Sequence, residues 1–235
     1  MTEPRYSSVL RVASYNIQKC MGVDLRRKPT RTMRVIDALG ADIVALQEAD
    51  KRLPPRPAAL PAHMLDDHGW HVAPLGGAGS LGWHGNAVIH RATVAVRSVA
   101  RLNLPGLEPR GAVVVEFDTS MGALRIVGAH LGLLAQWRRR QLHALMRQTA
   151  PRDPVPTVWL GDFNDWDRGP LLDRAAPAMR FLPPLPSFPA PAPIAPLDRI
   201  ALSAGLCATD HGVFGRRPAQ SASDHLALWA DLALA

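Results

Sequence analysis

The residues from 157 to 165 end in a group of polar side chains that could act on a phosphate. An apolar run over 155–160 predicts a buried strand, with prolines before it and Gly161 after it. Asp162 and Asn164 leave extended backbone on the same side, and Phe163 between them points into the protein. A carboxylate that accepts a proton, beside an amide that donates to an oxyanion, suits phosphoryl chemistry. An Asx-rich turn after a strand is the alternative interpretation.

Four further apolar segments end on, or just before, a polar residue. These residues are Asn16, Glu48, His130 and the pair Asp224-His225. Each has an ordinary explanation, such as a turn cap, a surface charge or a hydrogen-bonded core histidine. Together they offer oxygen ligands and two imidazoles, and Mg²⁺ or Mn²⁺ prefers one or two carboxylates completed by water and phosphate oxygens. The cysteines and histidines lack zinc spacing, so the pattern predicts a site for a hard divalent cation.

The elements that must position these residues follow from apolar periodicity. Strands are predicted over 9–17, 42–47, 112–117, 124–129, 197–203 and 226–234. Helices are predicted over 30–39, with Thr30 as N-cap, over 60–67, and over 133–149, with Leu134, Trp137, Leu142, Leu145 and Met146 on the apolar face. Residues 86–91 and 93–99 look like a hairpin, and the proline-rich stretch 183–196 predicts an ordered surface loop. Many short strands with few helices describe a layered α/β domain.

The amino-acid composition and net charge indicate which kinds of binding partner are favoured. The 235 residues carry a net charge of +7, almost all of the positive charge being arginine, which favours a polyanion such as nucleic acid, an anionic membrane surface or a phosphorylated substrate. Arg138 to Arg140 fall outside the apolar stripe of their helix, on a solvated face or against phosphate. Cys20 and Cys207 are expected to be reduced thiols. No 18-residue apolar run and no secretory leader occur, so we expect a cytoplasmic protein without a transmembrane segment.

Six short blocks resemble, in order, the signature set of the endonuclease/exonuclease/phosphatase superfamily. The blocks are Ser14-Tyr-Asn-Ile17, Leu46-Gln-Glu48, Gly128-Ala-His-Leu131, Gly161-Asp-Phe-Asn164, Leu197-Asp-Arg-Ile200 and Ser223-Asp-His225. The resemblance extends over residues 11–228. It implies a four-layer α-β-β-α sandwich of two packed mixed sheets, formed by a single catalytic domain over residues 1–235, with the polar strand ends at one edge.

The resemblance also implies a role for each matching residue. Glu48 resembles the principal ligand of Mg²⁺ or Mn²⁺, helped by Asn16 and Asp224, while Gln18 stands where some members carry an acid, so the number of metal ions stays open. Asp162 and His225 resemble the pair that orients and deprotonates the attacking water, and Asp198 the carboxylate that holds the histidine tautomer. The substrate would be held by Asn164 at the phosphoryl oxygen, His130 at the leaving oxygen, and Arg110 and Asn86 at the phosphate.

The expected function is divalent-metal-dependent hydrolysis of a P–O bond by water, in a monomer. Net charge and Arg138 to Arg140 favour a nuclease acting on nucleic acid. A phospholipid or small-molecule phosphodiesterase, in contact with a membrane surface in the first case, is the alternative, favoured by the short chain and the apolar loop 183–196. An inactive binding module is the third interpretation, and it is disfavoured because all six blocks keep their polar residue.

Overall fold

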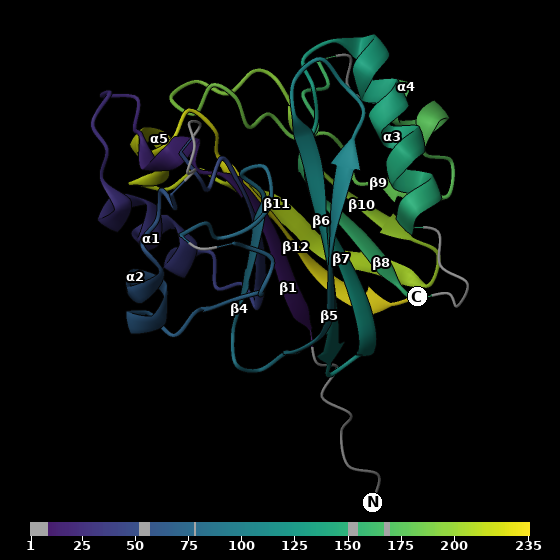
Figure 1. The fold of residues 1–235 in the computed structure, drawn as a ribbon, viewed down its shortest axis with the longest axis horizontal. Helices are drawn as coiled ribbons and strands as arrows, with labels where there is room; N and C mark the ends of the chain where they lie inside the picture. The colour runs from purple at the N-terminus through teal and green to yellow at the C-terminus, as the bar shows by residue number, and fades with distance from the viewer. Residues whose placement is uncertain (1–8, 52–56, 78, 150–154, 167–169) are drawn as a thin grey trace, which may run out of the picture.

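The computed structural model describes the chain except for residues 1–8, 52–56, 78, 150–154 and 167–169. The described residues form two mixed sheets of six strands each, which lie face to face (Figure 1). The first has the order β11 (Leu206–Phe214), β12 (Ala227–Leu234), β1 (Leu10–Asn16), β2 (Ile43–Gln47), β4 (Ala87–His90), β3 (His71–Val72). The second has the order β5 (Ala95–Leu104), β6 (Arg110–Thr119), β7 (Gly122–His130), β8 (Thr157–Asp162), β10 (Asp198–Ser203), β9 (Met179–Phe181).

Helices cover the outer face of each sheet. The first sheet is covered by α1 (Pro29–Ala38), α2 (Ala62–Asp67) and α5 (Ala219–Ala222), and the second by α3 (Ala135–Thr149) and α4 (Pro170–Ala175) (Figure 1). A further short 3₁₀ turn, η1 (Gln18–Cys20), follows β1. The result is the predicted four-layer α-β-β-α sandwich, and the prediction of two packed mixed sheets is confirmed.

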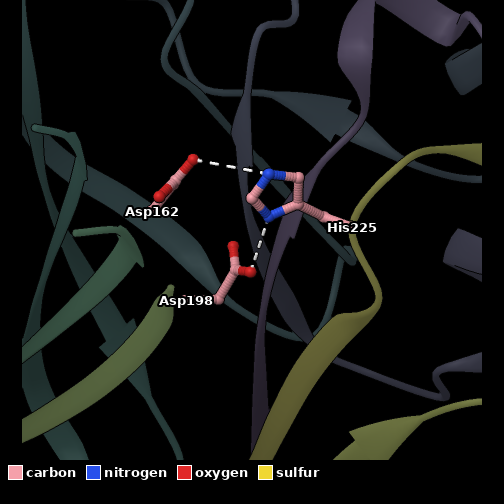
Figure 2. Close-up of side chains that lie close together, drawn as sticks. All are labelled: Asp162, Asp198 and His225. Carbon is pink, nitrogen blue, oxygen red and sulfur yellow. Dashed lines mark hydrogen bonds and ion pairs between the residues drawn. The ribbon is translucent and has the colours of Figure 1, made fainter. Parts of the chain in front are cut away.

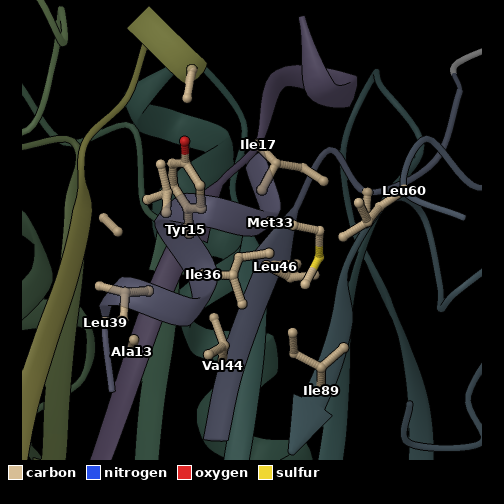
Figure 3. Packing of buried hydrophobic residues seen from close by; sticks show 14 of the residues in the cluster. Ala13, Tyr15, Ile17, Met33, Ile36, Leu39, Val44, Leu46, Leu60 and Ile89 are labelled. Carbon is tan, nitrogen blue, oxygen red and sulfur yellow. The ribbon is translucent and has the colours of Figure 1, made fainter. Parts of the chain in front are cut away.

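In the part of the chain that the structure describes, three apolar clusters fill the spaces between the four layers. The central one joins the facing sides of the sheets, where Val12 and Ile43 meet Val113 and Ile126. An outer cluster packs Met33 and Ile36 of α1 on Tyr15, Val44 and Leu46 of the first sheet (Figure 3). The third packs Leu142 and Leu145 of α3 on the second sheet. Because the central strands are buried on both faces, they are apolar runs rather than alternating patterns, which is why they could be predicted.

Two local predictions were wrong. Residues 86–99 form no hairpin, because β4 pairs with β2 and β3 in the first sheet while β5 pairs with β6 in the second. The chain therefore crosses between sheets where a tight turn was expected. Thr30 is not the N-cap of α1, which begins at Pro29 after Lys28, without a side-chain cap. Proline is favourable at the first helical position because its missing N–H would be unpaired there.

The prediction for α3 was wrong at its start. The helix begins at Ala135, leaving Leu133 and Leu134 exposed, and its rotation buries Arg138. The Arg138 guanidinium donates a hydrogen bond to the Leu133 carbonyl. Arg138 therefore does not belong to a solvated or phosphate-contacting arginine face, although Arg139 and Arg140 are exposed. The other predicted helices and strands lie close to their predictions. The elements β3, β9, β11, α4 and α5 were not predicted, and Cys20 and Cys207 are free thiols as expected.

No helix among the described residues is both long and apolar enough to span a membrane.

Candidate active site

The strand register of the second sheet brings three predicted residues into one row. His130 at the end of β7 pairs with Asp162 at the end of the parallel β8, and Asp162 pairs with Asp198 at the start of the antiparallel β10. Gly161 allows the close approach of these strands, since a Cβ there would lie 1.9 Å from the carbonyl oxygen of Ala129. The sheet therefore sets an imidazole and two carboxylates side by side at one edge.

The Asp162 carboxylate is the centre of this row. It is almost fully buried, Oδ2 accepts a hydrogen bond from Asn16 Nδ2 at 3.0 Å, and Oδ1 accepts one from the Asn164 backbone N–H at 3.0 Å. Asn16 comes from β1 of the other sheet, so this bond joins the two sheets at the site. The same Oδ2 lies 3.4 Å from Nε2 of His130 and 3.7 Å from Nε2 of His225. Asp162 thus stands between two imidazoles.

His225 is held from behind by a second carboxylate. Its Nδ1 lies 2.7 Å from Asp198 Oδ2, and the Ser187 hydroxyl donates to that oxygen at 2.6 Å. Figure 2 shows the resulting line from Asp198 through the ring of His225 to Asp162. Phe188, the neighbour of Ser187, packs its ring against His225 with centroids 5.0 Å apart. The loop 183–196 therefore holds Asp198 and His225 in place. Its proline content alone did not predict this role.

The two histidines are driven to opposite protonation states. Burial alone would lower the pKa of His225, but attraction to Asp198, Asp162 and Asp224 outweighs it and raises that pKa to about 10. For His130 burial prevails over the attraction of Asp162 and lowers the pKa to about 4. At neutral pH His225 is thus an imidazolium and His130 a neutral imidazole. Pairs of groups whose pKa values are pushed apart are typical of acid–base sites.

A strained turn connects the predicted metal ligands. Gln18 donates its side-chain N–H to Asp224 Oδ2 at 3.0 Å and its backbone N–H to Asn16 Oδ1 at 3.1 Å. The next residue, Lys19, forms an ion pair with Glu48. Gln18, Lys19 and Glu48 all have positive φ angles, of 45°, 56° and 52°. Non-glycine residues rarely adopt this conformation, and such strain gathers at functional sites.

The donor chemistry of this region suits a hard cation. Asn16, Glu48 and Asp224 offer only oxygen atoms, which Mg²⁺ and Mn²⁺ prefer, and the Lys19 ammonium already places a positive charge at Glu48. A different group, Asp162, Asp198 and His225, has its potential ligand atoms within 4.8 Å of one another. In that group Ser187 and His225 both contact Asp198 Oδ2, which is the arrangement of a hydrogen-bonded acid–base chain.

A cavity of about 160 Å³ opens beside this edge, and Lys19, Glu48, His84, Arg110 and His130 are among the residues that line it. We call it the catalytic cavity. Arg110 at the start of β6 faces it, with its guanidinium donating to Glu108 at 2.8 Å. The cavity therefore joins the predicted metal ligand Glu48 to the predicted phosphate and leaving-group contacts Arg110 and His130.

Two predicted substrate contacts are occupied by the backbone. Asn86 is fully buried, and its side-chain amide donates to the carbonyls of Gly111 at 3.0 Å and Trp83 at 3.3 Å. The Asn164 amide donates to the Leu131 carbonyl at 2.9 Å. Asn164 also has a φ of 50° and closes an Asx turn on Asp162, so the turn proposed as the alternative for this stretch is present together with the site. The substrate roles of both asparagines stay predictions.

Ser187 and Lys19 contact the site and were not found from the sequence. Ser187 lies between Pro186 and Phe188 in a loop without periodicity, and the sequence around Lys19 is that of an ordinary surface lysine. The only available signal for Lys19 was its position three residues after Asn16, inside the first polar block.

Comparison with known proteins identifies the class. The Endonuclease/Exonuclease/phosphatase family profile matches residues 13–225, and the chain belongs to this family. No curated protein matches its sequence.

Solved structures match the fold over almost the whole chain. A family member from Bacteroides thetaiotaomicron has a TM-score of 0.75 at 16% identity, covering 97% of this chain and 98% of its own. TDP2 from D. rerio complexed with single strand DNA product has a TM-score of 0.73 at 16% identity, with 96% and 99% covered. A mannosyl-6-phosphatase from Bacteroides thetaiotaomicron has a TM-score of 0.73 at 17% identity, with 96% and 100% covered. At these identities the likeness concerns the fold.

Proposed function

We propose that this family member hydrolyses a phosphoester P–O bond with water, in a reaction that depends on Mg²⁺ or Mn²⁺. The observation that carries the proposal is the Asp162 carboxylate, held by Asn16 and Asn164 and lying within 3.7 Å of both His130 and His225. A buried carboxylate with fixed orientation beside a cavity is suited to orient a water molecule and accept its proton.

The two histidines would act at different positions, His225 at the phosphoryl group and His130 at the leaving oxygen. His225 carries a proton at neutral pH, and Asp198 fixes its ring, so it can stabilise negative charge that develops on the phosphoryl group. His130 lines the catalytic cavity next to Arg110 and is proposed to face the leaving oxygen. A bound phosphate would raise the pKa of His130 by its opposite charge, which a proton donor at that place requires.

Glu48, with Asn16 and Asp224, would hold the metal ion, which supplies charge neutralisation and activation of water when bound. Lys19 would have to leave Glu48 for the ion to bind there, since both occupy the same carboxylate. Arg110 would bind a substrate phosphate oxygen, because a guanidinium matches its geometry. Under these assignments the site recognises the phosphate group, which every candidate substrate contains.

Charge and fold relatives alone allow two substrate classes, and a nucleic-acid phosphodiester is the first. It is supported by the net charge of +7 and by a fold relative that holds single strand DNA product. The burial of Arg138 removes one of the arginines on which this prediction rested. The mannosyl-6-phosphatase on the same fold equally supports a small phosphoester. An anionic membrane surface as partner stays a prediction with the same electrostatic basis.

Turnover of bis(p-nitrophenyl) phosphate tests the proposal. We expect hydrolysis with Mn²⁺ or Mg²⁺, its loss in excess chelator, and a fall of about 10²–10⁴-fold in kcat for Asp162→Asn. Asp118→Asn is the matched control. Asp118 lies at the end of β6 remote from Arg110 and the catalytic cavity, it is exposed, and its surface ion pair with Arg97 at 3.3 Å is weak. Absence of turnover in the metal-loaded, folded protein, or equal loss in both variants, would contradict the proposal.

A further inference from the structure

A second hollow of about 70 Å³ lies between the turn that joins β5 to β6 and the start of α3. We call it the leucine groove, and the residues that line it alone are Gly106, Leu107, Gly132, Leu133, Leu134, Trp137 and Gln141. Leu107, Leu133 and Leu134 are 80%, 60% and 53% exposed, although aliphatic side chains gain free energy on burial. Three such residues around one hollow form a contiguous apolar surface, which marks a binding site more often than scattered apolar residues do.

The leucine groove shares a wall with the catalytic cavity. Glu108 and Arg110 line both hollows. A ligand with its phosphate at Arg110 could therefore continue into the groove without crossing the protein. The groove is thus an extension of the candidate active site in the direction away from Glu48.

Hydrogen bonds from buried side chains fix the walls of the groove. Gln141 of α3 is buried, and it joins both walls by donating to the Pro105 carbonyl at 2.9 Å and accepting from the Gly132 N–H at 2.8 Å. Buried Arg138 donates to the Leu133 carbonyl and fixes the third side. A preformed hollow binds a ligand without a large ordering cost, as small-molecule sites usually do.

The side chains that line the groove favour an aliphatic ligand over a nucleobase. The exposed side chains are leucines, which offer no ring on which a nucleobase could stack. The one ring, Trp137, has the Arg140 guanidinium over it, 4.7 Å from the centroid. Arg110 lines both hollows, so a guanidinium lies at the boundary between groove and cavity. Aliphatic walls with a cationic side chain at one end suit an alkyl chain attached to an anionic head.

We infer that the leucine groove binds the aliphatic chain of a phosphoester substrate, the kind of molecule that a lipid phosphate provides, while its phosphate lies at Arg110. The inference rests on the proposed function and names its substrate class. It assigns to the exposed leucines a role in affinity and not in the reaction.

Alkylphosphonates of increasing chain length test this inference, because their C–P bond resists hydrolysis. Calorimetry would compare methyl-, butyl-, hexyl- and octylphosphonate on the Mg²⁺-loaded protein. Full burial of a methylene strengthens binding about fourfold, so a half-open groove should give about twofold for each added methylene. The double variant Leu133→Ser/Leu134→Ser should lose this chain-length dependence and keep the methylphosphonate affinity. Leu234→Ser, at the end of β12 and 57% exposed, is the matched control and should keep both.

Leu107→Ser is a second variant from the other wall, in case the double variant does not fold, and it should lower the chain-length dependence by about half. Equal affinity for all phosphonates in the unmodified protein, or an unchanged dependence in a folded groove variant, would overturn the inference. Oligothymidylate binding that the groove variants weaken, without any chain-length dependence, would assign the groove to nucleobases and overturn it as well. Hydrolysis of the nitrophenyl diester under the same conditions tells such a failure apart from failure of the proposed function.

Discussion

Replacing Asp198 by Asn should change the protonation state of His225. The pKa of His225 is raised to about 10, against an ordinary value of about 6.5. That difference corresponds to about 5 kcal/mol in favour of the imidazolium, at about 1.4 kcal/mol per pKa unit. Asp198 contributes both the largest attraction and a 2.7 Å hydrogen bond. Without its charge the effect of burial prevails, and we expect the pKa of His225 to fall below about 6.5.

Histidine NMR signals followed from pH 5 to 11 in the metal-free protein would measure this change. Ser187→Ala is the matched control, because it removes a hydrogen bond to Asp198 and keeps the charge, so the pKa of His225 should stay raised. Stability gives a second readout with a defined sign. A folded-state pKa above the unfolded value stabilises fully below about pH 6.5 and ceases to do so as pH rises through about 10. The free energy of unfolding lost in Asp198→Asn should therefore shrink across that window, and an imidazolium persisting above pH 9 in the variant would refute the reasoning.

Three further outcomes follow from the site and the fold. The double variant Asp162→Asn/His225→Ala should have a kcat little below that of the worse single variant, because Asp162 Oδ2 and His225 Nε2 lie 3.7 Å apart and the loss of either charge disturbs the other group; multiplicative losses would show that the two groups act independently. His130→Ala, if folded by circular dichroism, should slow an alkyl diester by about 10²–10⁴-fold and a nitrophenyl diester far less, since nitrophenolate leaves without a proton; equal losses would remove the leaving-group role. Arg138→Ala should lower the free energy of unfolding by about 1–3 kcal/mol in urea titrations, and exposed Arg139→Ala by less than about 0.5 kcal/mol; equal effects would contradict the burial of Arg138.

The sequence was informative where a strand is buried on both faces and ends in a polar residue. Such strands are continuous apolar runs, and a polar side chain at their end has few reasons to be there other than a site. Asn16, His130 and Asp162 were predicted on that basis, and the structure brings Asn16 within hydrogen-bond distance and His130 within ion-pair distance of Asp162. The common edge was predicted through the family resemblance, because strand order depends on contacts remote in sequence.

What the sequence could not predict depends on how elements are oriented. The segments 86–91 and 93–99 have a hairpin pattern, and only the packing of the two sheets decides that β4 and β5 separate. The rotation of α3 is set by the turn before it, so a charged Arg138 could be buried against the local pattern. Ser187 reaches Asp198 from a loop without periodicity. In each case tertiary packing overrides the conformational preference of the local sequence.

A single turnover in ¹⁸O-labelled water tests the central claim most directly. With the Mn²⁺-loaded protein and an alkyl diester of phosphate, we expect one ¹⁸O atom in the phosphate product and none in the alcohol, because water attacks phosphorus. Chelator or Asp162→Asn should suppress the labelled product, since the metal ion and the carboxylate together activate that water. Label in the alcohol, or undiminished labelling of the phosphate product in excess chelator, would contradict the account.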